Sequence, residues 1–220
     1  MTNEEFAKRH FAYFHEPNGI FKNKLGLNNP KTLSEMEYQI VDQNITQLLQ
    51  DPPKIKDLSD LSKIHKFLFG PIYFWAGIPR NSTNNGQIPY DLSKQGHDFL
   101  PAQAIPMGVN YINGDLATLK DGQPIKPTMY AKLLTNINDL HPFFEGNGRS
   151  TKTFLQCLAL NHHQELNFDR HQEPLIKLLN QGDNPTILNK ISKLLDVKPQ
   201  ETDKLKRKTK LSHHSNDFEL

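Results

Sequence analysis

Apolar residues recur three and four positions apart along most of this chain, which is the spacing of one face of an α-helix. A chain patterned in this way has to bury helix faces against one another. The pattern predicts helices over about residues 2–16, 34–50, 58–73, 101–119, 128–140, 150–161, 172–180 and 185–195. Thr2 with Glu5 and Ser34 with Glu37 have the spacing of a capping box, so we expect helices to begin there.

The helical pattern is interrupted between residues 77 and 99, where three Gly, two Pro and three Asn occur. Short alternating stretches in this segment indicate an irregular β-hairpin or flap, and long loops within compact domains are often functional. The predicted fold class is therefore mainly α, a helical bundle with one small β-hairpin. We expect one domain over residues 1–198, followed by a basic tail over residues 199–220.

Cysteine content and charge exclude several classes of protein. The single Cys157 rules out an internal disulfide framework and a zinc site built from cysteines. The chain has no run of about 20 apolar residues and begins with a polar segment, so we expect a soluble, cytoplasmic protein without a membrane partner. The net charge of +2 is concentrated in the tail, where residues 203–220 hold five basic and three acidic residues. The remaining body is neutral, which disfavours an enzyme that follows nucleic acid along a basic face.

The segment His141-Pro-Phe-Phe-Glu-Gly-Asn-Gly-Arg-Ser-Thr-Lys152 lies between two predicted helices and resembles an anion-binding turn. Gly146 and Gly148 allow a tight turn that exposes backbone N–H groups, and the start of a helix adds unpaired donors and a partial positive charge. Arg149 falls in the first helical turn, where a cation is unfavourable unless an anion binds. Asn147 can donate to a phosphate oxygen.

Two further side chains add chemistry to this turn. Glu145 is an acid beside a phosphate site, which suits a ligand of a magnesium ion that bridges phosphates. His141 can accept a proton near pH 7 and is therefore a candidate base. A Gly-rich loop with a capping Asn and a solvated Arg is the alternative, but the His and the acid at these positions favour a site.

HPFFEGNGR resembles the signature of Fic-domain proteins, which transfer AMP from ATP to a protein hydroxyl. The similarity is complete as far as Arg149, and Lys152 stands where the family has a second Arg. Residues 19–37, 64–77 and 92–101 resemble other segments of the family in the same order. The similarity covers about residues 19–197 and implies a Fic-type helical bundle with a flap over the active site.

The resemblance implies a role for each motif residue. His141 would deprotonate the target Ser, Thr or Tyr hydroxyl, and Glu145 would hold Mg²⁺ between the α- and β-phosphates of ATP. The nucleotide-binding residues would be Gly146, Asn147 and Gly148 at the α-phosphate, Arg149 at the β-phosphate, Lys152 at the γ-phosphate, and Lys94 from the flap. The flap, residues 92–99, would bind the target protein by main-chain pairing.

Three other functions remain open at this stage. A related Doc-type kinase would transfer the γ-phosphate, although Doc-like motifs carry Ala and Lys where this chain has Gly146 and Gly148. A catalytically weak nucleotide-binding interaction module is a second alternative. A nucleic-acid-binding protein that uses its basic tail is a third, and the neutral body makes it the least favoured.

The end of the tail suggests regulation. Ser215 and Glu219 fit the (S/T)xxxE part of an inhibitory helix found in Fic proteins, although Leu220 stands where Gly or Asn is expected. The alternatives are inhibition by this tail, inhibition by a separate antitoxin, and a tail whose Ser and Glu match the pattern by chance. The sequence does not identify the target, the oligomeric state, or whether the protein is a cell-division regulator, a toxin or a secreted effector.

Overall fold

Helices make up most of the protein in a computed structural model, which describes residues 1–94, 96–168 and 172–200. The helices are α1 (Asn3–Phe14), α2 (Pro30–Gln50), α3 (Ser59–Phe69), α4 (Ile105–Ala117), α5 (Pro127–Leu140), α6 (Asn147–Asn161), α7 (Gln172–Leu179) and α8 (Pro185–Ser192). The strands are β1 (Ser93–Lys94), β2 (His97–Asp98), β3 (Gln164–Phe168) and β4 (Leu195–Pro199). The mainly α fold class is confirmed. Ser215 and Glu219 lie outside the described residues.

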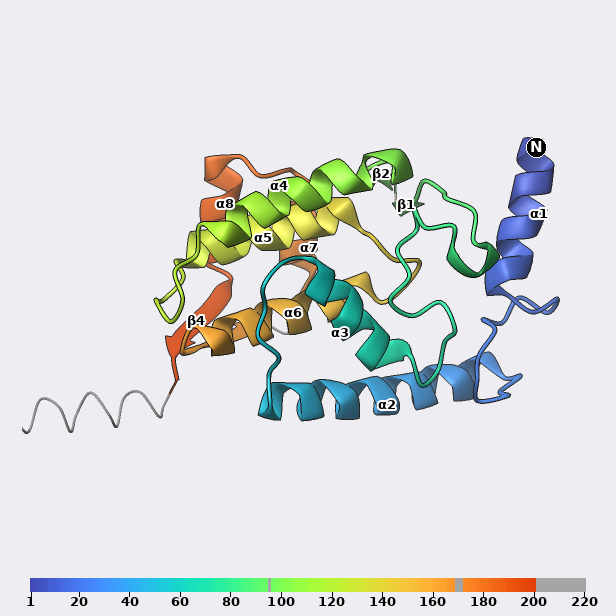
Figure 1. Ribbon diagram of the computed structural model, residues 1–220, viewed down its shortest axis with the longest axis horizontal. Helices are drawn as coiled ribbons and strands as arrows, with labels where there is room; N and C mark the ends of the chain where they lie inside the picture. Colours follow the sequence, from blue (N-terminus) through green and yellow to red (C-terminus); the bar gives the residue numbers. More distant parts are fainter. Residues whose placement is uncertain (95, 169–171, 201–220) are drawn as a thin grey trace, which may run out of the picture.

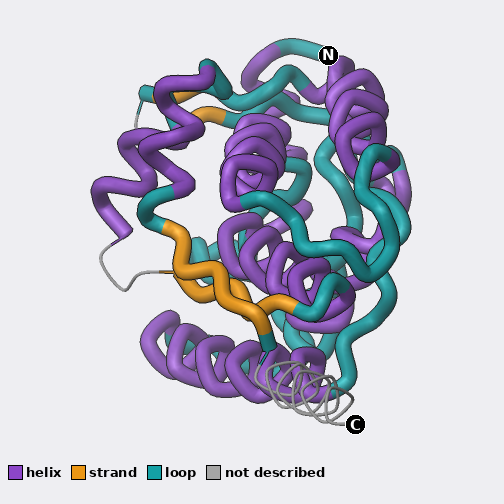
Figure 2. The backbone as a smooth tube through the Cα atoms, turned by 90° about the vertical axis from the view of Figure 1, so that its left-hand side faces the viewer, coloured by secondary structure: helices purple, strands orange, loops and turns teal. Residues whose placement is uncertain are grey.

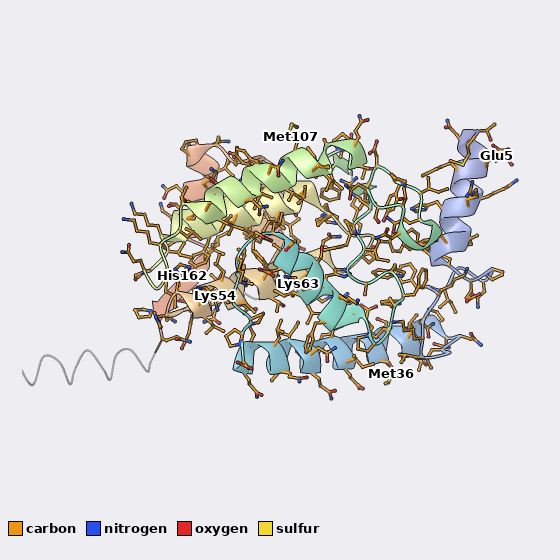
Figure 3. All side chains as sticks on the ribbon, viewed as in Figure 1. Glu5, Met36, Lys54, Lys63, Met107 and His162 are labelled. Atoms are coloured by element: carbon orange, nitrogen blue, oxygen red, sulfur yellow. The ribbon has the colours of Figure 1, made fainter. Side chains whose placement is uncertain are left out.

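Helix α5 lies at the centre of the bundle and packs against α4, α6, α7 and α8. Half of its residues are buried, and they follow the three-and-four spacing of apolar residues that predicted a helix here. The buried residues are Tyr130, Ala131, Leu133, Leu134, Thr135, Ile137 and Leu140. Helix α4 covers one side of α5 and turns its outer face to solvent, where Met107 points away from the body (Figure 3). Helices α3 and α6 pack together, and α2 contacts both of them. None of the described helices is long and apolar enough to cross a bilayer.

Two helix starts coincide with caps in the local sequence, and the predicted cap of a third is wrong. The capping box of Thr2 and Glu5 is present at α1, and Asn184 caps α8 by accepting a hydrogen bond from the backbone N–H of Ile187. The predicted capping box at Ser34 is wrong, because α2 begins four residues earlier, at Pro30. Asn29 caps it instead, and Pro suits the first helical position because its missing N–H would be unpaired there anyway.

A second antiparallel pair, β3 with β4, was not predicted and is drawn in orange in Figure 2. Gln164 pairs with Pro199 and Phe168 with Leu195, so the chain's last described segment returns to the end of α6. The predicted helix over residues 185–195 ends at Ser192 for this reason. The expected domain boundary at residue 198 falls within β4 and stays a prediction.

The expected hairpin between residues 77 and 99 is present but short, and β1 pairs with β2 through Ser93–Asp98 and Lys94–His97. The base of the flap is held by Arg80, whose side chain is fully buried. Its guanidinium donates hydrogen bonds to the carbonyls of Tyr90, Leu100, Leu140 and His141. Arg80 thus fastens the flap to the end of α5, where the motif begins.

Helix α1 lies at one end of the molecule and reaches the motif through aromatic contacts (Figure 1). Phe14 is fully buried and stacks on Phe144, with ring centroids 3.8 Å apart. Phe14 also contacts Trp75 and Tyr90 edge-on. The first helix of the chain therefore supports the loop that carries the motif.

Candidate functional site

The motif forms a loop that leaves α5 at His141 and enters α6 at Asn147. His141 caps α5 in the left-handed conformation, with φ 40°, which is uncommon for a residue other than glycine. Its backbone N–H still donates to the carbonyl of Ile137, so the strained residue belongs to the last turn of the helix. Strained backbone of this kind often marks a functional site.

The imidazole of His141 is held in one orientation. Its Nδ1 lies 3.3 Å from the carbonyl oxygen of Asn138, which can only accept, so Nδ1 carries the proton and Nε2 keeps a free lone pair. The ring of Phe99, from the flap, stacks on the imidazole at a centroid distance of 3.7 Å. Burial, and then the charge of Lys94, lowers the pKa of His141 to about 3. The imidazole is therefore neutral at pH 7, as a general base has to be.

The two glycines of the motif differ in the space that a side chain would find at each position. Gly146 has φ +82°, and a Cβ there would lie 2.6 Å from the ring of Phe69. Gly148 has no such constraint, because a Cβ there would enter open space. Gly146 is therefore needed by the fold, whereas Gly148 leaves room for a ligand. No side chain caps the N-terminus of α6, so its first N–H groups are available to an anion.

Asn147 fixes the loop through two hydrogen bonds that the sequence did not indicate. Its amide oxygen accepts from the backbone N–H of Phe143 at 2.9 Å, and its amide nitrogen donates to the carbonyl of Phe143 at 2.8 Å. The side chain is buried and fixes the loop. A hydrogen bond from its side chain to phosphate stays a prediction, and the loop-fixing pair is what the structure supports.

His65 in α3 holds the other side of the loop. It is fully buried. Its Nε2 lies 2.8 Å from the carbonyl oxygen of Glu145, and its Nδ1 accepts from the backbone N–H of Gly77 at 2.8 Å. His65 therefore ties the motif to the segment that leads into the flap.

The pH dependence of stability should report on His65. Burial lowers its pKa to about 4, against an ordinary value of 6.5 in the unfolded chain. Below pH 6.5 the unfolded state binds the proton and the folded state does not, so the free energy of unfolding falls as the pH drops toward 4, by about 3 kcal/mol from this group. Urea unfolding at pH 7.5 and 4.5 should show a smaller difference in His65→Gln than in the wild type. If the free energy of unfolding depends on pH equally in the two proteins, His65 is not the source of that dependence.

A pocket of about 670 Å³ opens beside the loop. The structure brings together in its lining all the motif and flap residues predicted to act on a nucleotide, together with an apolar wall from α5 and α7. The predicted residues in the lining are Lys94, His141, Glu145, Gly146, Asn147, Gly148, Arg149 and Lys152. Lys152 is half-buried with its ammonium 5.5 Å from the ring centre of Phe168, and burial lowers its pKa.

Two ion pairs at the pocket were not predicted. Lys94 Nζ lies 2.7 Å from Glu145 Oε1, so the flap is joined to the motif. Arg149 Nη2 lies 2.5 Å from Glu37 Oε1, and the guanidinium sits over the ring of Phe69. Glu37 belongs to α2 and was interpreted from the sequence only as a capping residue.

Backbone donors, three cations, an acid and a neutral histidine thus surround one pocket, and this combination suits a phosphorylated ligand. Residues 56–159 match the model of the Fic/DOC family. This matched segment contains the whole motif, so residues 56–159 are similar to the Fic/DOC family, as the motif indicated.

One curated relative and two solved structures are also similar to this chain. The chain is 28% identical over 157 residues to the protein adenylyltransferase VbhT of Bartonella schoenbuchensis. The matched region covers 69% of this chain and 31% of the relative. The chain thus spans about a third of that relative's length. It shares its fold with the N-terminal Fic domain of a Bep effector from Bartonella quintana (TM-score 0.76, 22% identity, 92% of this chain and 99% of that one). It also shares it with BepC of Bartonella tribocorum with bound AMPPNP (TM-score 0.73, 20% identity, 88% and 99%).

Proposed function

We propose that this protein transfers AMP from ATP to a Ser, Thr or Tyr hydroxyl of a target protein. The observation that carries the proposal is the neutral, oriented His141 in the wall of the same pocket as the N-terminus of α6. The hydroxyl oxygen would attack the α-phosphorus and the bond to the β-phosphate oxygen would break, so pyrophosphate leaves. The hydroxyl proton would pass to Nε2 of His141.

The phosphates would be held by the loop and the helix that follows it. Backbone N–H groups from Gly146 to Gly148 would face the α-phosphate, where charge develops during transfer. Arg149 would hold the β-phosphate and Lys152 the γ-phosphate. Nucleotide binding is supported by the likeness in fold to BepC, whose structure contains AMPPNP. The apolar wall of Leu134, Leu175 and Leu179 gives the pocket a surface for an aromatic base.

Glu145 fits a magnesium ligand, because a carboxylate beside the phosphate loop offers the hard oxygen that this ion prefers. The described residues contain no cluster of three His, Cys, Asp or Glu side chains that could hold a metal, so phosphate oxygens and water would complete the shell. When bound, the ion would neutralise phosphate charge. Lys94 now pairs with Glu145, and it would be free to reach the nucleotide once that pair opens.

The target would bind along the flap, where β1 and β2 form a short two-stranded sheet with no other strand beside them among the described residues. Main-chain pairing to such an edge tolerates many sequences. His97 in β2 lies close to Asp139 on α5, so the flap is positioned over the end of α5 that carries His141. Control of the activity by the chain's own tail or by a separate antitoxin remains part of the proposal.

AMP transfer is favoured over γ-phosphate transfer by Gly148. A Doc-like Lys at this position would put a side chain into the space that Gly148 leaves open beside the pocket. The experiment that tests the proposal uses ATP labelled on either the α- or the γ-phosphate, with lysate as the source of target. We expect protein labelling from α-labelled ATP alone. Labelling from γ-labelled ATP alone would establish a kinase, and labelling from neither would favour a binding module.

The two glycines give a matched test of the phosphate site. In Gly148→Ala the added methyl enters the pocket, so we expect ADP affinity to fall about tenfold, while the free energy of unfolding changes by less than about 1 kcal/mol. In Gly146→Ala the left-handed backbone and the contact with Phe69 should destabilise the protein by about 2 kcal/mol or more. Calorimetric ADP titration and urea unfolding measure both. Wild-type ADP affinity in Gly148→Ala would place the phosphates elsewhere.

A further inference from the structure

Arg149, in the first turn of α6, is held by a residue far away in the sequence. Glu37 accepts from Arg149 through Oε1, at 2.5 Å, across 112 positions of the chain. The hydroxyl of Tyr73 donates to the other carboxylate oxygen, Oε2. Arg149 lines the pocket and Glu37 does not, so the carboxylate contacts the guanidinium outside the pocket.

The arrangement restricts Arg149 on two sides. The guanidinium is planar with five N–H donors, and Glu37 engages the donor at Nη2. The ring of Phe69 lies 4.7 Å from the guanidinium carbon and supports its face. A long side chain that is already held in place loses less freedom when it binds a ligand. The donors that Glu37 does not engage remain for an anion in the pocket.

Glu37 is itself held in place. Its side chain is 18% exposed, whereas that of Arg149 is 41% exposed, so the pair is anchored at the carboxylate end. Tyr73 is buried and stacks on Trp75 at a centroid distance of 4.5 Å, which fixes its hydroxyl. Burial, and then the bond to Glu37, raises the pKa of Tyr73, so the phenol stays protonated and remains a donor.

We propose that Glu37 is a positioning residue that fixes Arg149 for the β-phosphate of the nucleotide, with Tyr73 fixing Glu37 in turn. The inference rests on the proposed function, because it assigns the ligand of Arg149 to a diphosphate. The opposite role for Glu37 can also be tested. A carboxylate on Arg149 could instead compete with phosphate for the cation, and its removal would then tighten binding.

The test is calorimetric titration of the full chain with ADP and with AMP, in EDTA so that no metal contributes. We expect Glu37→Gln to weaken ADP binding about tenfold, because the charge-assisted bond that orients Arg149 is lost. AMP has no β-phosphate, so its affinity should be unchanged. Glu35→Gln is the matched control, since Glu35 lies on the same helix and is exposed. A distorted fold would weaken both nucleotides, which separates positioning from a structural role.

Further variants separate the possible failures. Arg149→Ala should weaken ADP binding more than Glu37→Gln does, and the double variant should bind ADP no more weakly than Arg149→Ala alone. If Arg149→Ala binds ADP like the wild type, the proposed phosphate site is wrong. If Arg149→Ala weakens binding but Glu37→Gln leaves ADP affinity unchanged or tighter, the positioning role is wrong.

Tyr73→Phe keeps the ring and removes only the hydroxyl, so it carries the test if Glu37→Gln does not fold. We expect a loss of about threefold in ADP affinity, since one hydrogen bond to the carboxylate is removed, with AMP affinity unchanged. An equal loss of affinity for ADP and AMP, or an unchanged affinity for ADP, would show that Tyr73 does not position Arg149 through Glu37.

Discussion

His141→Ala should transfer AMP about 10²–10⁴-fold more slowly than the wild type while binding ADP with similar affinity. Nε2 of His141 is the acceptor that the proposal assigns to the hydroxyl proton, and the phosphates have other partners in Gly148, Arg149 and Lys152. Single-turnover transfer from α-labelled ATP measures the rate, and calorimetric titration measures the affinity for ADP. A variant that transfers AMP at the wild-type rate would show that another group accepts the proton.

The left-handed backbone at this position calls for a second variant. His141 has φ 40°, and alanine tolerates that conformation less well than asparagine does, so His141→Ala can also disturb the loop. His141→Asn keeps a residue that accepts this backbone and has no basic nitrogen. If the histidine acts as a base, both variants should lose transfer equally. If only the alanine variant loses transfer, the role of His141 lies in the shape of the loop.

The helices could be predicted because their causes are local. The spacing of apolar residues in α5 and the caps at Thr2 and Asn184 can each be seen within a few positions of the sequence. The start of α2 was missed because two start signals compete there. Asn29 with Pro30 lies upstream of Ser34 with Glu37, and Glu37 forms an ion pair with Arg149 instead of closing a capping box.

The motif was predictable for the same reason, since nine consecutive residues carry most of the chemistry. What holds the motif was not, because its supports come from other parts of the chain. Glu37 lies 112 positions from Arg149, His65 lies 80 from Glu145, and Lys94 lies 51 from Glu145. One sequence contains no signal that pairs such residues. The pairing of β3 with β4 was missed in the same way.

Arg80 was missed for a different reason, because an arginine in a polar loop is usually solvated. Here its side chain is fully buried and satisfied by carbonyls, with Asp91 at 4.0 Å as a distant and largely exposed partner. Burial lowers the pKa of Arg80, yet guanidinium keeps its charge throughout the physiological range. A buried cation is stable here only because carbonyl oxygens surround it.

Replacing Arg80 should therefore have the largest effect on stability. Arg80→Ala leaves the carbonyls of Leu140 and His141 without their donor and opens a cavity between α5 and the flap, so we expect the free energy of unfolding to fall by about 3–5 kcal/mol. Arg80→Lys keeps the charge but has fewer donors, and it should lose less. Arg9→Ala, on the exposed side of α1, is the matched control and should change stability by under about 0.5 kcal/mol. Urea unfolding measures all three variants. If Arg80→Ala falls within 1 kcal/mol of the wild type, the flap and α5 are held together by other contacts, and a lower rate of AMP transfer in that variant could not be assigned to this anchor.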